Sequence, residues 1–190
     1  MNRRDALSRV ALLFGGTIIG TEFFLSGCKS SDKRSEALNF SKDTIDFLDE
    51  VGETILPATA SSPGAKEAGI GEFMKTIVTD CYEEKDQKIF MEGIVKLNTA
   101  SGKKYSKDFM LLAVKEKHDL LVELDKEAKN YEKNKKEKGP NHYFTMMKQL
   151  TVWGYFTSKP GATKALRYVA VPGRYDGCIP YKKGDKAWAI

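Results

Sequence analysis

Few residues in this chain have the chemistry and spacing of a catalytic or metal site. The two histidines are His118, among charged residues, and His142, which precedes Tyr143 at an expected helix start. An imidazole in the first setting is usually exposed, and one in the second usually caps or packs. No Ser-His-Asp or Cys-His set, phosphate-binding Gly-rich loop, dinucleotide fingerprint, metalloprotease helix or Cys-x-x-Cys-His haem motif is present. The sequence therefore predicts no catalytic, metal-binding or cofactor-binding residue in this chain.

A segment near the C-terminus has the residues of a contact loop. Residues 171–181 read Val-Pro-Gly-Arg-Tyr-Asp-Gly-Cys-Ile-Pro-Tyr, and this density of Pro and Gly excludes a helix. Turn signals at 172–173 and 176–177 enclose Arg174 and Tyr175, a planar five-donor fork beside an amphipathic ring. Two interpretations remain open: a loop that contacts a partner, or a tail whose apolar side chains fill a groove of a helical bundle.

The N-terminus has the architecture of an export signal. Arg3 and Arg4 provide a positive head, and a mostly apolar run from Val10 to Leu25 follows. The run is too short and too interrupted for a comfortable membrane span. Leu25-Ser26-Gly27-Cys28 resembles the lipobox of bacterial lipoproteins, which implies cleavage before Cys28 and lipid on its thiol. We therefore expect a lipoprotein of the bacterial cell envelope that faces the periplasm.

The export route has two interpretations. Arg3-Arg4 is similar to a twin-arginine signal, which exports folded proteins, although Asp5 and Ala6 are not the strongest residues for it. The alternative is an ordinary signal for unfolded chains. In either case the predicted organisation is an export signal at 1–27, a lipidated flexible tether at 28–41 and a helical domain at 42–190.

Once Cys28 carries lipid, two cysteines remain. In an exported protein an even number of remaining cysteines favours a disulfide, here between Cys81 and Cys178. Closing a loop of about a hundred residues would contribute roughly 4–5 kcal/mol at most in the chain-entropy model. Two buried thiols are the alternative, since a free cysteine packs as a small hydrophobe.

The charge pattern does not favour nucleic acid as a partner. The net charge is +5, but Arg3 and Arg4 belong to the expected signal and a lysine-rich run at 133–138 supplies much of the rest. No basic stripe interleaved with aromatic residues is present. We therefore expect no nucleic-acid binding.

Apolar spacing of three and four residues predicts an all-α fold. The expected bundle has about five to six helices and an irregular C-terminal tail. The predicted helices cover 43–56, 72–82, 85–97, 106–129, 142–157 and 162–168, and the helix at 142–157 is the most apolar and central. A break is expected at 98–104, and Ser106 is expected to cap the start of the next helix. No stretch alternates with period two, so no sheet is indicated.

Three stretches together resemble the gluconate 2-dehydrogenase subunit 3 family. They are Ile55–Thr59 followed by Pro63-Gly64-Ala65, His142–Phe144 with Leu150–Ser158, and Pro172–Cys178. The resemblance covers roughly residues 47–180. Tyr155-Phe156-Thr157-Ser158 and Arg174–Cys178 are its specific parts.

The resemblance implies an accessory subunit rather than a catalyst. Its partner would be a large flavoprotein of the glucose-methanol-choline type, which holds FAD, and a cytochrome c with haem could accept the electrons. The small subunit would assist export, stability and membrane anchoring of the flavoprotein. The residues expected at the partner interface are Pro57, Tyr155, Phe156, Arg174, Tyr175 and Asp176. The alternative is a free-standing helical lipoprotein that binds a small ligand or envelope component in a pocket lined by Trp153, Tyr155 and Phe156.

Overall fold

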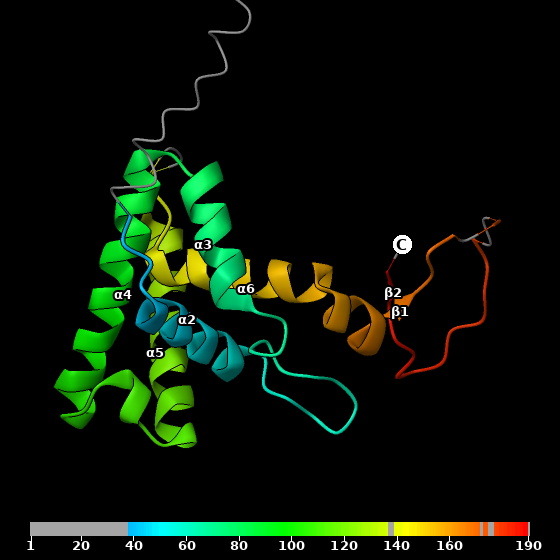
Figure 1. The fold of residues 1–190 in the computed structure, drawn as a ribbon, viewed down its shortest axis with the longest axis horizontal. Coiled ribbons are helices and arrows are strands. Elements are labelled where there is room, and N and C mark those ends of the chain that lie inside the picture. The colour runs from blue at the N-terminus through cyan, green and yellow to red at the C-terminus, as the bar shows by residue number, and fades with distance from the viewer. Residues whose placement is uncertain (1–37, 137–138, 172, 175–176, 190) are drawn as a thin grey trace, which may run out of the picture. The chain divides into compact units, whose positions relative to one another are not determined.

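The computed structural model describes residues 38–136, 139–171, 173–174 and 177–189. Its α-helices are α2 (Lys42–Ile55), α3 (Ile70–Cys81), α4 (Glu84–Tyr105), α5 (Val114–Asn134) and α6 (Tyr143–Thr157). A short 3-10 helix, η2 (Phe109–Leu111), precedes α5, and a single π-helical turn, η3 (Gly161–Ala165), follows α6. The fold is mostly helical, which confirms the predicted all-α class (Figure 1).

Helix α6 is the centre of this domain, as predicted. It contacts α2, α3, α4 and α5, and in Figure 1 it runs across the domain behind α3. Buried apolar side chains from all five helices form the core: Phe47, Leu48, Val51, Met74, Val78, Phe90, Leu97, Leu120, Leu121, Leu124, Phe144, Met147 and Leu150. Within each helix these residues lie on one face, and that face packs against the other helices.

The ordered domain begins inside the segment predicted as a tether. Ser41 caps α2, because its Oγ accepts a hydrogen bond from the backbone N–H of Thr44 at 3.2 Å. Just before it, Phe40 packs against the buried ring of Phe90, with 6.4 Å between the ring centroids. The predicted signal at 1–27, Cys28 and most of the tether lie outside the described residues.

Helix α4 is longer than predicted, because the expected break at 98–104 is wrong. Ser101 is fully buried, and its Oγ donates to the carbonyl of Lys107 at 2.7 Å, so the helix continues through this segment. Ser106 ends α4 in the left-handed region at φ 55° and donates its N–H to Gly102. It therefore terminates one helix and does not start the next, which begins at Val114.

The C-terminal segment contains a small sheet that the sequence did not indicate. The predicted helix at 162–168 is helical only as η3, after which β1 (Arg167–Tyr168) pairs in parallel with β2 (Trp188–Ala189). The two strands are separated by about twenty residues of chain, so the pairing is non-local. Among the described residues, no helix has both the length and the apolar character needed to cross a membrane.

Candidate interaction surface

One carboxylate organises the long loop between α2 and α3. The Oε1 atom of Glu53 accepts a hydrogen bond from the backbone N–H of Ala58, and its Oε2 accepts one from that of Lys66, both at 2.9 Å. A Cβ added to Gly64 would lie 2.1 Å from the same carboxylate, so only glycine leaves room for it. A side chain from the end of α2 thus holds the loop near both ends, and we call residues 56–69 the clamped loop and the Glu53 carboxylate its clamp.

Tyr155 holds the middle of this loop, which corrects its predicted role. It was expected at the partner interface, but only 4% of it is exposed. Its hydroxyl donates to the carbonyl of Pro63 at 2.6 Å, inside the protein. A side chain that is buried and hydrogen-bonded within the domain is not available to a partner. Tyr155 is therefore part of the fold and not of its contact surface.

The glycine before this tyrosine allows α6 and α3 to pack closely. A Cβ at Gly154 would lie 2.5 Å from the ring of Phe73, closer than side chains ever approach. Phe73 in turn makes an edge-to-face contact with Trp153, with 5.3 Å between centroids. Packing thus explains the Gly-Tyr pair: Gly154 allows the close approach of α3, and Tyr155 hydrogen-bonds to the loop between α2 and α3.

The opposite side of the last two turns of α6 is apolar and exposed. Val152, Trp153 and Phe156 are 40%, 52% and 37% exposed, respectively. Their spacing of one and four residues puts them on the same face of the helix. Phe156 stacks edge-to-face on Tyr155 at 5.1 Å, and Trp153 rests on Phe73, so both rings are supported from below. We call these three residues the α6 aromatic face.

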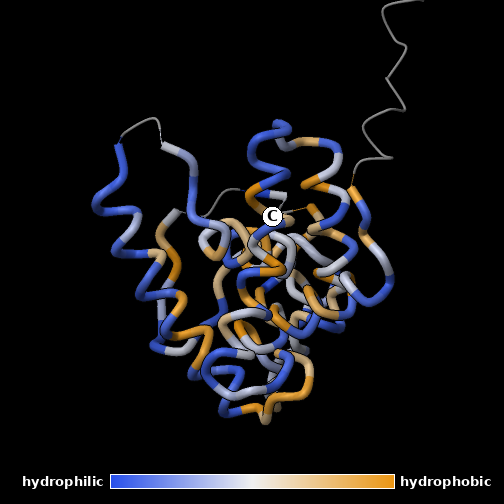
Figure 2. Tube along the Cα trace, turned by 90° about the vertical axis from the view of Figure 1, so that its left-hand side faces the viewer, coloured by the Kyte–Doolittle hydropathy of each residue, from blue (hydrophilic) through white to orange (hydrophobic). Residues whose placement is uncertain are grey.

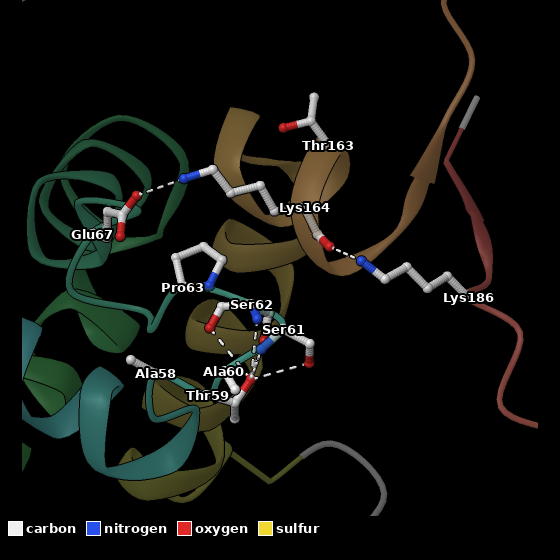
Figure 3. Close-up of a pocket in the computed structure, with 10 residues that line it drawn as sticks. All are labelled: Ala58, Thr59, Ala60, Ser61, Ser62, Pro63, Glu67, Thr163, Lys164 and Lys186. Carbon is white, nitrogen blue, oxygen red and sulfur yellow. Dashed lines mark hydrogen bonds and ion pairs between the residues drawn. The ribbon is translucent and has the colours of Figure 1, made fainter.

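A polar hollow lies between the clamped loop and the C-terminal segment. It has a volume of about 520 Å³ and is open to solvent. Its wall consists of Ala58, Thr59, Ala60, Ser61, Ser62, Pro63, Glu67, Thr163, Lys164 and Lys186. Figure 3 shows Lys164 joining its two sides: its Nζ reaches Glu67 at 3.2 Å, and its carbonyl accepts a hydrogen bond from Lys186.

This hollow does not correspond to the pocket expected for a small-ligand lipoprotein. Trp153 and Phe156 line neither it nor a second hollow beside Pro140, and Tyr155 faces Pro63. Of the three aromatic residues expected to line that pocket, Trp153 and Phe156 are exposed and Tyr155 is buried. Two form an outward face and one lies in the core.

The C-terminal segment adds further exposed aromatic side chains. The guanidinium of Arg167 lies over the ring of Trp188, 4.6 Å from its centroid. Trp188 and Tyr168 are about half exposed, and Arg174 is exposed. Pro57 is also exposed, as an interface residue must be. Tyr175 and Asp176 lie outside the described residues.

The two remaining cysteines are separate free thiols in this structure. Cys81 is the last residue of α3, Cys178 belongs to the C-terminal segment, and both are exposed. The structure therefore contains neither the disulfide nor the buried thiols that the sequence left as alternatives.

The histidines occupy the positions that the sequence indicated. His118 is exposed on α5. His142 caps α6, where its Nδ1 accepts a hydrogen bond from the N–H of Phe144 at 3.2 Å. Burial lowers the pKa of His142, and the nearby carboxylate of Glu127 partly opposes this. Within the part of the chain that the structure describes, no three His, Cys, Asp or Glu side chains are grouped as metal ligands would be.

The sequence did not predict the role of the Glu53 carboxylate, and the interface predicted from it included Tyr155, which is buried. Glu53 gave no signal, because the partners of its carboxylate are backbone groups up to thirteen residues away. The α6 aromatic face did give a signal, because residues 152, 153 and 156 lie within one arc of about 100° of the helix. Spacing alone does not separate Tyr155 from this arc, since residues 152 and 155 are also neighbours on the helix surface.

The family model of gluconate 2-dehydrogenase subunit 3 matches residues 42–173. This range begins with α2, includes the clamped loop and all of α6, and ends one residue before Arg174. No curated protein and no solved structure matches the chain. The match covers more than half of the chain and confirms the resemblance found in the sequence.

Proposed function

Because this chain belongs to the gluconate 2-dehydrogenase subunit 3 family, we propose that it is the non-catalytic small subunit of a membrane-associated, periplasmic FAD-dependent dehydrogenase. Membership of this family implies an accessory subunit that associates with the catalytic subunit of a dehydrogenase complex. The proposed substrate is a sugar, sugar acid or glycoside. The large subunit, of the glucose-methanol-choline type, would hold the FAD, and a further subunit could carry haem c.

The observation that carries the proposal is the α6 aromatic face. Adjacent large apolar side chains that are exposed on an isolated subunit often mark the surface that a partner protein covers. Aromatic residues held rigidly by neighbours lose little conformational entropy on binding, which is why Trp and Tyr are frequent at interface hot spots. Trp153 and Phe156 have this support from Phe73 and Tyr155. We propose that the flavoprotein covers this face together with Pro57 and the segment around Arg174, including Tyr175 and Asp176.

Attachment to the membrane is a separate part of the proposal. The lipobox at Cys28 supports a lipid anchor, and the twin-arginine pair supports export together with a folded partner. In such a complex the small subunit would stabilise the flavoprotein and retain it at the periplasmic side of the membrane.

The test is a mild-detergent pull-down of the tagged, full-length chain from its native host, with mass spectrometry and a visible absorption spectrum. We expect a large co-purifying protein with flavin absorbance. Val152→Glu places a charge on the α6 aromatic face and should reduce recovery of the flavoprotein at least tenfold, since burying one unpaired charge costs more than the roughly 1.4 kcal/mol that a factor of ten represents.

The matched control is Val95→Glu, the same change at a residue of α4 that is 66% exposed. It should leave recovery unchanged. Arg174→Ala should weaken assembly more than it lowers the thermal stability of the isolated subunit, and an equal loss of both would return Arg174 to a structural role. Recovery of a single colourless protein from the native host would overturn the proposal in favour of the free-standing lipoprotein.

A further inference from the structure

The C-terminal segment after η3 differs from the helical part of the domain in its burial. Along the helices hydrophobic and hydrophilic residues alternate, and hydrophobic ones from every helix pack into the core (Figure 2). From residue 166 to residue 189, by contrast, none of the described residues is buried. In Figure 1 this segment lies beyond the end of α6, on the side of the domain away from α4. We call residues 166–189 the C-terminal arm.

The arm nevertheless has regular structure at its base, where β1 and β2 pair in parallel. Arg167 stands opposite Trp188, and its guanidinium lies over the indole ring. Because successive side chains of a strand point to opposite faces, the next residue, Tyr168, lies on the other face of the pair. Trp188 and Tyr168 are 49% and 52% exposed, so each face of the pair carries an aromatic ring that is about half exposed.

Each strand of this pair has an open edge. The N–H groups of Arg167 and Val169 point toward β2, where backbone carbonyls accept them at 2.8 Å and 3.1 Å. Since alternate residues of a strand direct their backbone groups to opposite sides, the N–H and C=O of Tyr168 point away from β2. Among the described residues the N–H of Tyr168 has no backbone acceptor. The sheet contains two strands, so no further strand covers this edge within the described residues.

A pair of strands in this state is incomplete as a sheet. Parallel strands occur almost always in sheets whose two faces are covered, and two strands alone are marginal in water. The pair in the arm has exposed aromatic rings on both faces and an open edge at Tyr168. A third strand would satisfy the backbone groups of Tyr168, and the chain that carries it would cover the rings.

From these observations we infer that an extended segment of the catalytic subunit pairs with β1 and becomes a third strand of the sheet. The open N–H and C=O groups of a strand edge are matched by an extended polypeptide. A lipid surface does not match them, since unpaired backbone groups are unfavourable among acyl chains. The inference rests on the proposed function for the identity of the partner, because family membership implies association with a catalytic subunit.

The edge of β1 is also continuous with the proposed interface. β1 contacts η3, and η3 contacts α6, which carries the α6 aromatic face. Arg174 belongs to the chain between β1 and β2. A partner that covers the α6 aromatic face and the segment around Arg174 therefore reaches the edge of β1 without a separate contact region.

The test compares two variants of Tyr168 in the tagged, full-length chain, each produced in the native host. Tyr168→Pro removes the outward N–H and leaves the two hydrogen bonds to β2 in place, since an edge strand tolerates proline where the N–H faces solvent. Tyr168→Ala removes the same ring but keeps the N–H, so the difference between the variants reports on the backbone group. Recovery of the flavoprotein is measured for both, together with the unfolding midpoint of each isolated subunit.

We expect Tyr168→Pro to recover several times less flavoprotein than Tyr168→Ala, with equal unfolding midpoints. Equal recovery by the two variants, while the wild-type chain recovers the flavoprotein, would overturn the inference and leave the proposed function intact. A wild-type chain that recovers no flavoprotein would instead overturn the proposed function, and the inference with it.

Hydrogen exchange of the wild-type protein tests the same edge without a substitution. Mass spectrometry of overlapping peptides should show slower exchange of the Tyr168 amide in the complex than in the isolated subunit, because a paired amide is protected. Unchanged exchange in the complex would overturn the inference. Protection in the isolated subunit that increases with its concentration would also overturn it, since a second copy of this chain would then occupy the edge.

Discussion

Tyr155→Phe gives the sharpest test of the division between residues that fold this domain and residues that contact a partner. The change removes one oxygen atom and leaves the ring and its contact with Phe156 in place. What is lost is the 2.6 Å hydrogen bond from the hydroxyl to the carbonyl of Pro63. Because this bond is buried, the carbonyl would remain without a donor inside the protein.

The expected cost follows from that unpaired acceptor. A buried polar group left without its partner costs about 1–3 kcal/mol. For a domain of this size, each kcal/mol lowers the unfolding midpoint by roughly 2–4 °C, so the shift should be about 2–12 °C. The midpoint is measured on the full-length protein by far-ultraviolet circular dichroism, and recovery of the flavoprotein is measured in parallel below the transition.

Tyr143→Phe is the matched control. Tyr143 is also buried, at 7% exposure, and burial raises its pKa to about 12. Its hydroxyl forms no hydrogen bond with the described residues, so its removal should change the midpoint little. An unchanged midpoint for Tyr155→Phe together with loss of the flavoprotein would refute the reasoning and return Tyr155 to the interface.

Two further predictions concern α6. Gly154→Ala should lower the free energy of unfolding by about 1–3 kcal/mol, because the added methyl would overlap Phe73; a midpoint equal to wild type in thermal unfolding would contradict the close packing. Burial lowers the pKa of His142 below its ordinary value near 6.5, so the unfolded chain binds the proton more readily. The contribution of His142 to stability should therefore be complete above about pH 6.5 and decline as the pH falls. His142→Asn keeps an acceptor for the N–H of Phe144, and unfolding measured across this range should then lose that pH-dependent component.

The helical core was predictable because it depends on local periodicity. Residues such as Phe47, Leu48 and Val51 recur at the spacing of one helix face, and their burial follows from that spacing alone. The end of α4 was predicted wrongly for an equally local reason. Ser and Gly at 101–102 normally favour a turn, but here the hydroxyl of Ser101 finds a backbone acceptor in the turn that follows, and the helix persists.

Features that depend on distant residues could not be read from local patterns. Tyr155 bonds to a residue 92 positions away, and β1 pairs with a strand about twenty residues further on. Neither contact leaves a periodic trace in the sequence. The resemblance to the family identified Tyr155 as a specific residue, but a family motif does not distinguish a residue that must pack from one that must touch a partner.

The apolar character of the last two turns of α6 supports a covered surface on this subunit. A helix that is hydrophobic all round is normally buried all round. In this domain Met147, Leu150 and Tyr155 are buried, whereas Trp153 and Phe156 are 52% and 37% exposed. The two exposed rings pack against Phe73 and Tyr155 on one side, which restricts their motion. Their other side has no packing partner among the described residues. Contact between this apolar surface and water is unfavourable in free energy. A second protein that covers the surface removes it from water and so stabilises the complex. A dehydrogenase subunit that covers the last two turns of α6 would therefore complete the burial that α2, α3, α4 and α5 begin.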